Sequence, residues 1–426
     1  MRVLYVVGTC LTKNTSANMS HNCYVQGLLE NGYEVDIIMA NDSWGQNDKR
    51  LPKWDKAQYY VYNNVSKIEK LRRRFQKVGI SQTSINQKNN NIEEKKFESE
   101  KVTIKQKVRA LLKSTFYLLF PVDPVYPLEK EWIKNAANYS CTEKYDLVVS
   151  NSSPAASHKL VLELLDKGNI RFERWVQIWE DPWYFDLYGG HTDEIKEEEH
   201  LLLSRASEIY YVSPLTLMYQ KKYYPDCAKK MNVVPLPAME YEKETYDRVN
   251  GNIIFGYFGD YFSKTRDLRP FYDAMCLNNS CGYIYGDTDL NLEETKNLKI
   301  EGRVTLEELA KIQERTDVLV HLCNLHGGQI PGKIYHYSVT NKPILFILDG
   351  TSEEKKMLYN FFKQFERYYF CNNDIESILS AIKKIEKDGI HQKWEKVIEF
   401  QPKEVVKKII LRGGHSNETD YSYSNI

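Results

Sequence analysis

The 426-residue sequence lacks several features that would place it in a class at once. It has no net charge, because 58 Lys and Arg residues balance 58 Asp and Glu residues. This balance argues against a dedicated nucleic-acid binder, which usually carries a basic excess. No run approaches the roughly 18 apolar residues of a membrane-spanning helix. The opening segment, MRVLYVVGTCLTK, has no signal-peptide cleavage pattern, and we interpret it as a first strand.

Signs of a metal or disulfide framework are also missing. The eight cysteines form no CxxC pair, and the nine histidines form no HxxxH or HExxH pair. Scattered cysteines of this kind are typical of reduced, mostly buried thiols in a cytosolic protein. The segment GTCLTK after the first apolar run contains a single glycine, so it lacks the GxGxxG spacing of a dinucleotide site.

The sequence does contain two series of apolar, β-rich runs that alternate with polar or amphipathic segments. The first series is RVLYVV (2–7), VDIIM (35–39), LVVS (147–150), WVQIW (175–179) and IYYV (209–212). The second is IIFGYF (253–258), GYIYG (282–286), VLVHL (318–322), PILFIL (343–348) and RYYF (367–370). Apolar strands that alternate with helices indicate parallel sheets covered on both faces.

We therefore predict an α/β protein with two doubly wound, Rossmann-like domains that face a cleft. The predicted domains are residues 1–240 and 250–395, joined by a segment rich in Pro and charge. A helix over 396–412 and a disordered polar tail over 413–426 should follow.

Positive charge is concentrated in the basic insert, residues 66–120. Residues 66–115 carry 14 Lys and Arg residues but 5 Asp and Glu residues. Apolar residues recur there at steps of three and four from Ile104 to Leu119, which predicts a basic amphipathic helix. This helix could cover part of the core, or it could lie on an anionic membrane surface. In the second case the membrane-facing residues are Lys105, Lys107, Arg109 and Lys113.

Ligands of doubly wound sheets bind beyond the carboxyl ends of the strands, so residues after each strand are site candidates. In the first series Gly8 could admit a ligand to the backbone, or it could simply form a tight turn. His158, in SNSSPAASH, faces either the cleft or the core. Asp181 ends the run QIWED and could accept a proton from an acceptor hydroxyl, or it could serve as a turn residue.

The second series carries cations at strand ends. Gly259 ends a strand, and Lys264 and Arg266 follow it before a helix. Cations on such a turn suit a phosphate, although a solvated loop is the alternative. The triplet Asp287-Thr288-Asp289 matches a metal-binding DxD pattern, but we interpret it as a chance match in a surface loop.

The segment NLHGGQIPGKIYHY gives the strongest signal. Gln329 and Gly332 follow a strand and are candidates for donor binding, and Pro331 suits the first turn of a helix. Free N–H groups at that helix start, together with the charge of Lys333, would form a cradle for a diphosphate leaving group.

Together these segments resemble two-domain (GT-B fold) glycosyltransferases of the family-four kind, from the bacterial surface-polysaccharide branch. The resemblance covers roughly residues 1–412, and its most specific motif is PGKIYHY followed by KPI. Supporting segments are YDLVVSNSSPAASH, WVQIWEDPW, FGYFGDYFSKTRDLRP and GRVTLEELAKIQERTDVLVHL. The end of the basic insert, with FPVDPVYPLEKEW after it, is also similar to the membrane-docking insert of that branch.

The resemblance implies an enzyme that moves a sugar from a nucleotide sugar to a lipid-linked glycan, with retention of configuration. Lys333 and Arg266 would hold the donor diphosphate, and Asp181 would lie near the acceptor. The loop after Gly286 and the turn at 302–305 would receive the nucleotide base. No metal or other cofactor would be needed. The implied partners are the nucleotide sugar, the lipid-linked acceptor and an anionic membrane surface, at the cytoplasmic face of the inner membrane.

The sequence departs from the family at one motif. Many members carry Glu-x7-Glu, and alignment on Lys333 places Gly328 and His336 at those two positions. His336 could still hydrogen-bond a ribose hydroxyl. Loss of both acids favours an alternative, a catalytically silent homologue that acts as a partner or acceptor-binding subunit. A sugar-nucleotide epimerase would fit the cleft but not the basic insert.

Overall fold

The computed structural model describes residues 1–43, 45–49, 51–65, 123–187, 189, 191–238, 251–389 and 394–412. The basic insert, most of the segment between the two predicted domains and the polar tail lie outside these ranges. The predicted amphipathic helix and the four membrane-facing residues therefore stay predictions.

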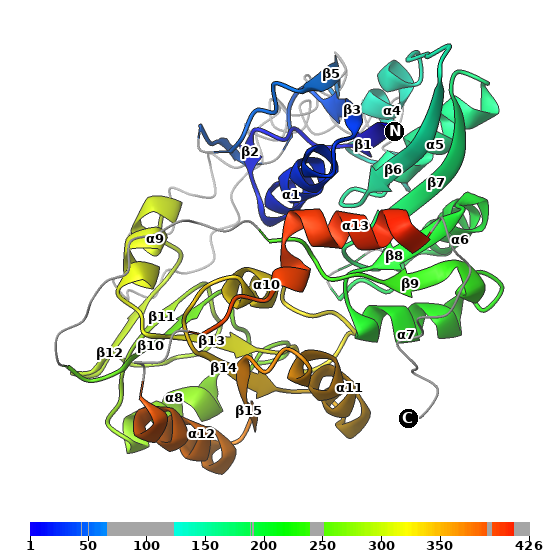
Figure 1. Ribbon diagram of the computed structural model, residues 1–426. Coiled ribbons are helices and arrows are strands. Elements are labelled where there is room, and N and C mark those ends of the chain that lie inside the picture. The colour runs from blue at the N-terminus through cyan, green and yellow to red at the C-terminus, as the bar shows by residue number, and fades with distance from the viewer. Residues whose placement is uncertain are drawn as a thin grey trace, which may run out of the picture.

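The first half of the chain forms a parallel sheet in the order β5-β3-β1-β6-β7-β8-β9 (Figure 1). Its strands are β1 (Arg2–Val7), β3 (Glu34–Ala40), β5 (Ala57–Tyr62), β6 (Lys144–Asn151), β7 (Arg171–Trp179), β8 (Glu208–Tyr211) and β9 (Met231–Val233). The connecting segments include α1 (Ser16–Glu30), α4 (Lys130–Ala136), α5 (Ala156–Asp166), α6 (Asp193–Arg205), α7 (Pro214–Tyr223) and the 3-10 turn η1 (Ala228–Lys230). Strand order reverses between β1 and β6, and ligands of such sheets bind at this switch point.

The second half repeats this plan in the order β12-β11-β10-β13-β14-β15. Its strands are β10 (Ile254–Phe258), β11 (Cys281–Tyr285), β12 (Leu298–Glu301), β13 (Val318–Leu322), β14 (Ile344–Leu348) and β15 (Tyr368–Asn372). Its helices are α8 (Arg269–Leu277), α9 (Leu306–Glu314), α10 (Lys333–Ser338), α11 (Ser352–Lys363) and α12 (Ile375–Asp388). The strand order of this sheet reverses between β10 and β13. The segments that follow these two strands carry Arg266 and Lys333, the candidate phosphate-binding residues.

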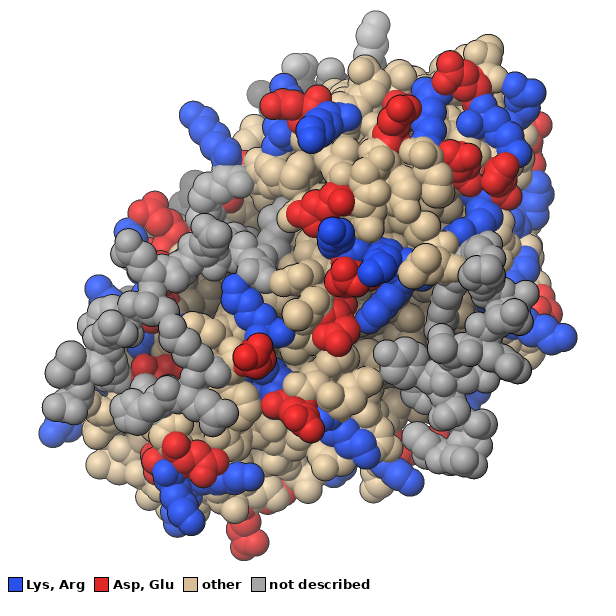
Figure 2. Space-filling model, in the orientation of Figure 1, with Lys and Arg blue, Asp and Glu red and all other residues tan. Residues whose placement is uncertain are grey.

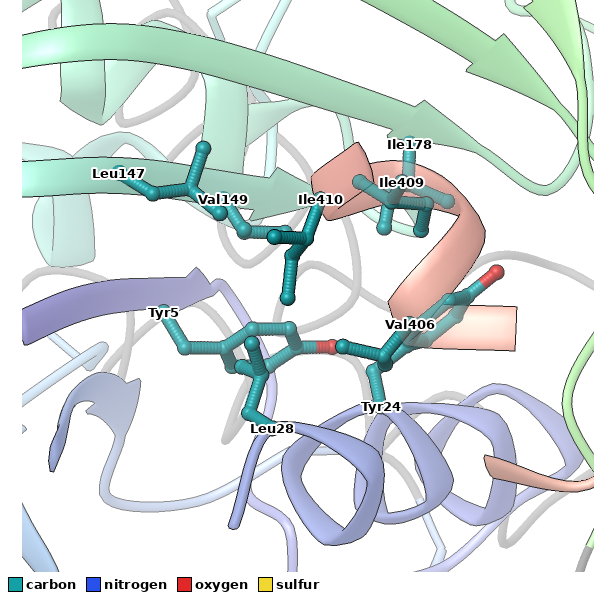
Figure 3. Close-up of a pocket in the computed structure, with 9 residues that line it drawn as sticks. All are labelled: Tyr5, Tyr24, Leu28, Leu147, Val149, Ile178, Val406, Ile409 and Ile410. Carbon is teal, nitrogen blue, oxygen red and sulfur yellow. The ribbon is translucent and has the colours of Figure 1, made fainter. Parts of the chain in front are cut away.

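The chain then returns to the first domain through η2 (Ile398–Phe400) and α13 (Pro402–Arg412), and α13 lies beside α1 (Figure 1). A Cβ on Gly27 of α1 would stand 2.2 Å from the carbonyl oxygen of Pro402, so only glycine allows this approach. The guanidinium of Arg174 donates to the carbonyls of Ile409 and Ile410, each at 3.1 Å. Between α1, α13 and the sheet remains a gap of about 10 Å³ among apolar side chains (Figure 3). A gap of this size is no larger than one water, and it reflects packing.

The predicted fold class and all the predicted strands are confirmed. Reasoning from sequence missed the strands β5, β9 and β12, which all lie at sheet edges. It also missed the small antiparallel ribbon of β2 (Lys13–Asn14) and β4 (Gln46–Asn47). Edge strands are only partly buried, so their sequences are not the continuous apolar runs that mark central strands.

The described surface agrees with the balanced composition. Basic and acidic side chains are interspersed on the face shown in Figure 2. None of the helices in the described ranges has the length and hydropathy needed to cross a membrane.

Candidate active site

Two cationic side chains converge on Gly259, where β10 ends at the switch point of the second sheet. Lys333 is the first residue of α10, and its Nζ donates a hydrogen bond to the carbonyl of Phe258. A Cβ on Gly259 would stand 3.5 Å from Lys333 Nζ and 3.9 Å from Arg266 Nη1. Because residue 259 is glycine, it places no side chain of its own between the two cations, and the Tyr257 hydroxyl lies 3.8 Å from the same point.

The electrostatics of this pair favour an anion. Burial lowers the pKa of Lys333 to about 8, and the positive charges of Arg266 and Arg303 act in the same direction. At neutral pH the Lys333 amine is therefore still mostly protonated, although burial disfavours its charged form. A partly desolvated cation beside another cation is costly unless an anion compensates it.

Asp260 compensates only part of this charge: its carboxylate acts to raise the pKa of Lys333, but Arg303 also pairs with it. Arg303 binds the Asp260 carboxylate through Nε, at 3.0 Å, and through Nη2. Although burial opposes the change, this pair lowers the pKa of Asp260. Arg266 hydrogen-bonds the hydroxyl of Tyr257, whose pKa burial still raises to about 12. Lys333 and Arg266 thus leave the strand end positively charged.

A hollow of about 460 Å³ lies next to the two cations, at the ends of β11 and β12. Gly286 connects it to Gly259, because a Cβ on Gly286 would stand 2.0 Å from the Gly259 carbonyl oxygen. The hollow is within the usual size range of small-molecule sites. Its lining residues are Tyr261, Gly286, Asp287, Thr288, Ile300, Glu301 and Gly302.

The carboxylates of the DxD match are both held by protein groups. Asp287 lies 3.1 Å from Arg303 Nε. Asp289 accepts hydrogen bonds from the backbone N–H and the hydroxyl of Ser263, at 2.8 and 2.7 Å. These contacts explain both acids as loop residues, while metal independence stays a prediction.

Asp181 follows β7 and meets the second domain. Its Oδ1 accepts a hydrogen bond of 2.5 Å from Gln329 Nε2, and Gln329 Oε1 accepts one of 3.0 Å from the N–H of Leu187. Burial raises the pKa of Asp181 to about 6, although the Gln329 hydrogen bond opposes this change. A carboxylate with a pKa near the working pH is a suitable general base. The Gln329 amide therefore connects the two domains. The sequence did not predict this contact, because Gln329 comes shortly before Lys333 and was grouped with it on the donor side.

The structure explains His158 and Gly8 by packing. His158 is fully buried, its Nδ1 lies 2.7 Å from Ser150 Oγ, and its ring packs on Trp179. Burial lowers the pKa of His158 to about 3. A Cβ on Gly8 would stand 2.7 Å from Pro154 Cγ, so glycine is required by this contact. Of the alternatives left open by the sequence, the structure favours the core position for His158, and at Gly8 it shows close packing against Pro154.

A pair that the sequence reasoning missed lies beside Asp181. The buried His21 of α1 has its Nδ1 3.8 Å from Glu180 Oε1, and its Nε2 lies 3.3 Å from the Ser153 carbonyl. Burial lowers the pKa of His21 to about 4 and raises the pKa of Glu180. No spacing pattern links these residues, because they come from different crossover units.

The departure at Gly328 has a steric cause. Gly328 has a φ of +69°, and a Cβ there would stand 2.6 Å from the ring of Tyr219 in the first domain. Thr216 also donates to the Gly328 carbonyl at 2.9 Å. An acidic side chain cannot occupy position 328 while Tyr219 packs there.

The remaining candidates are His336, Gly332 and Lys264. His336 is half-buried on α10, and burial together with the Lys333 charge lowers its pKa to about 4, so its ring is neutral at pH 7. Gly332 is the N-cap of α10, where a Cβ would stand 3.2 Å from Leu236. Lys264 is exposed.

Comparison with solved structures establishes the fold. No protein-family model matches the sequence, and no curated protein matches it. A structure described as trehalose-6-phosphate from E. coli bound with UDP-2-fluoro glucose is 10% identical, with a TM-score of 0.50 and coverage of 97% of this chain and 98% of that one. The OtsA apo structure is 9% identical, with a TM-score of 0.51 and coverage of 98% and 100%. At these identities the likeness shows the fold alone, which is the predicted two-domain GT-B type.

Proposed function

We propose that this protein is a glycosyltransferase that moves a sugar from a nucleotide-sugar donor to an acceptor hydroxyl. The observation that carries the proposal is the convergence of Lys333 and Arg266 on Gly259, beside the hollow of about 460 Å³. A nucleoside diphosphate needs cations for its phosphates and a neighbouring hollow for its base. Both lie here at adjacent strand ends, where ligands of this fold class bind.

The reaction assigns a role to each side of the site. The bond between the sugar C1 and the donor phosphate oxygen breaks, and a bond from C1 to the acceptor oxygen forms. Lys333 and Arg266 stabilise the negative charge that develops on the leaving diphosphate. Asp181, or the donor phosphate itself, takes the proton of the acceptor hydroxyl. The two cations make a metal unnecessary for charge stabilisation.

The finer parts of the proposal rest on the resemblance and on the basic insert. The acceptor would be a lipid-linked glycan of surface-polysaccharide synthesis, and transfer would retain the anomeric configuration. The 14 Lys and Arg residues within 66–115 would hold the protein on the anionic inner face of the membrane.

UDP is the first probe of this proposal, because a solved structure of the same fold is described as bound with UDP-2-fluoro glucose. Calorimetry should detect UDP binding to the full chain, and Lys333→Met should weaken it. Lys311→Met is the matched control, since Lys311 is an exposed lysine of α9 that pairs with Glu307 at 2.8 Å. Equal affinity of UDP for the wild type and Lys333→Met would refute the donor site.

The second candidate, a catalytically silent homologue, is favoured by one observation. The ring of Tyr219 fills the place where a side chain at position 328 would begin. The two candidates differ in one measurement, the hydrolysis of a panel of nucleotide sugars. Binding of a nucleotide without hydrolysis or transfer of any nucleotide sugar would favour the silent homologue.

A further inference from the structure

Three side chains that commonly bind metals meet on the surface of the first domain, away from the donor cations. His200 comes from the middle of α6, and Asp226 and Cys227 come from the turn between α7 and η1. His200 Nε2 lies 2.7 Å from Asp226 Oδ2, and Cys227 Sγ lies 3.8 Å from the same oxygen. All three potential ligand atoms lie within 4.8 Å of one another.

We propose that His200, Asp226 and Cys227 form a binding site for Zn²⁺. Imidazole nitrogen, carboxylate oxygen and thiolate sulfur are the ligand types that zinc takes in proteins. Zinc bond lengths in tetrahedral geometry place such atoms about 3.3–3.7 Å apart. The sulfur–oxygen distance of 3.8 Å is already close to this, and the His200–Asp226 pair at 2.7 Å must open by less than about 1 Å. A thiolate ligand favours zinc over magnesium or calcium.

The surroundings fix the ligands on one side and leave the other side open. The ring of His200 lies parallel to Tyr224, with centroids 5.7 Å apart and an angle of 8° between the rings. The side chains of His200 and Asp226 are 47% and 60% exposed, while Cys227 is 2% exposed. Three protein ligands with one face toward solvent leave the fourth position to water. On binding, the Cys227 thiol proton leaves to solvent, because the thiolate is the ligand form.

The topology separates this site from the strand ends of the active site. Cys227 comes shortly before β9, at the amino edge of the sheet, whereas Asp181 follows the carboxyl end of β7. On that amino edge Lys230 Nζ also donates to the carbonyls of Ser204 and Ala206, at 2.6 and 2.9 Å. The zinc inference therefore does not depend on the proposed function.

Zinc bound here would brace a helix that supports the acceptor side. The residue before His200, Glu199, accepts hydrogen bonds from the N–H groups of Trp183 and Tyr184, at 3.2 and 2.8 Å. These residues closely follow Asp181 in the chain. A zinc ion that ties α6 to the turn before η1 would hold this support in place.

The test is a titration of the untagged full chain with Co²⁺, followed by competition with Zn²⁺. One equivalent of Co²⁺ should produce a thiolate-to-cobalt charge-transfer absorption, and Zn²⁺ should displace it. Cys227→Ser should abolish this absorption. His200→Ala, a substitution of an exposed residue, should weaken Co²⁺ binding at least tenfold. Cys276→Ser is the matched control, because Cys276 is an exposed thiol on α8.

The outcomes are decisive because His200 is exposed and its replacement should not disturb folding. Absence of the absorption in the wild type would overturn the proposal. So would an absorption that survives His200→Ala unchanged, or one that disappears with Cys276→Ser instead of Cys227→Ser. As a second readout, Zn²⁺ should raise the melting temperature of the wild type and of Cys276→Ser but not that of His200→Ala.

Discussion

Replacing Lys333 by Met should make the protein more stable and a worse donor binder. Burial lowers the pKa of Lys333 from 10.5 to about 8, a shift of about 2.5 units. At about 1.4 kcal/mol per unit, the folded state holds the charged ammonium at a cost of about 3 kcal/mol. Loss of the hydrogen bond to the Phe258 carbonyl subtracts about 1 kcal/mol. The free energy of unfolding at pH 7 should therefore rise by about 2 kcal/mol.

The same pKa shift determines how the free energy of unfolding changes with pH. The folded-state pKa lies below the unfolded one, so the cost is full below about pH 8 and disappears as pH rises toward 10.5. The stability of the wild type should therefore increase over this window through Lys333. That part of the increase should be absent in Lys333→Met. Denaturant unfolding at pH 7 and pH 9 measures the difference.

Donor binding should change in the opposite direction. A charge-assisted contact to phosphate is worth about 1.5–3 kcal/mol, so UDP should bind Lys333→Met roughly 10- to 100-fold more weakly. In the wild type, UDP affinity should fall about tenfold from pH 7 to pH 9 as Lys333 loses its proton. Lys333→Arg should remove this fall, because a guanidinium stays charged. A destabilised Lys333→Met that binds UDP normally would refute the reasoning and make Lys333 a structural residue.

Four further outcomes are expected. Asp181→Asn should lower transfer by about 10²–10⁴ and abolish the loss of rate below about pH 6, whereas a dead His158→Ala beside a normal Asp181→Asn would exchange their roles. Gly286→Ala should disrupt both the fold near β10 and UDP binding, since its Cβ would meet a carbonyl oxygen at 2.0 Å; an unchanged melt would contradict this. Excess EDTA should leave transfer intact, and activity restored by Mn²⁺ would instead give Asp287-Thr288-Asp289 a metal. Reversal of the four membrane-facing charges of the basic insert should release the protein from anionic vesicles without loss of UDP binding, and equal pelleting on neutral and anionic lipid would end the docking hypothesis.

The sequence predicted the central strands because burial on both faces leaves a continuous apolar run. Val3 to Val7 of β1 are fully buried, as expected for a central strand that is covered on both faces. The edge strand β5, AQYYVY, has no fully buried residue, so it does not form a continuous buried run and gives a weaker signal. The order of strands could not be derived from these runs, since it depends on which crossovers pack best.

The site was predictable where chemistry and sequence neighbourhood coincide. Lys333 and Arg266 both belong to the second domain, and each follows a strand through a glycine-containing segment. Parallel strands bring such carboxyl ends together. Contacts between domains were not predictable. Gln329 was assigned to the donor because it precedes Lys333, yet its amide binds Asp181 at 2.5 Å. The zinc ligand His200 lies in a different element from its partners, so no spacing pattern could reveal the cluster.

Position 328 shows how the absence of an acidic side chain can be misinterpreted from the sequence alone. The missing acid looks like a lost function, but the structure shows that a different contact has taken its space. The ring of Tyr219 packs against Gly328, and its hydroxyl donates to Glu354 Oε1 of α11 at 3.0 Å. Glu354 also caps α11 through the N–H of Thr351, at 2.8 Å, so this carboxylate serves the helix and the domain contact. Glycine at 328 is therefore part of how α7 and α11 hold the two domains together. The proposed activity relies on Lys333, Arg266 and Asp181, which this contact leaves in place.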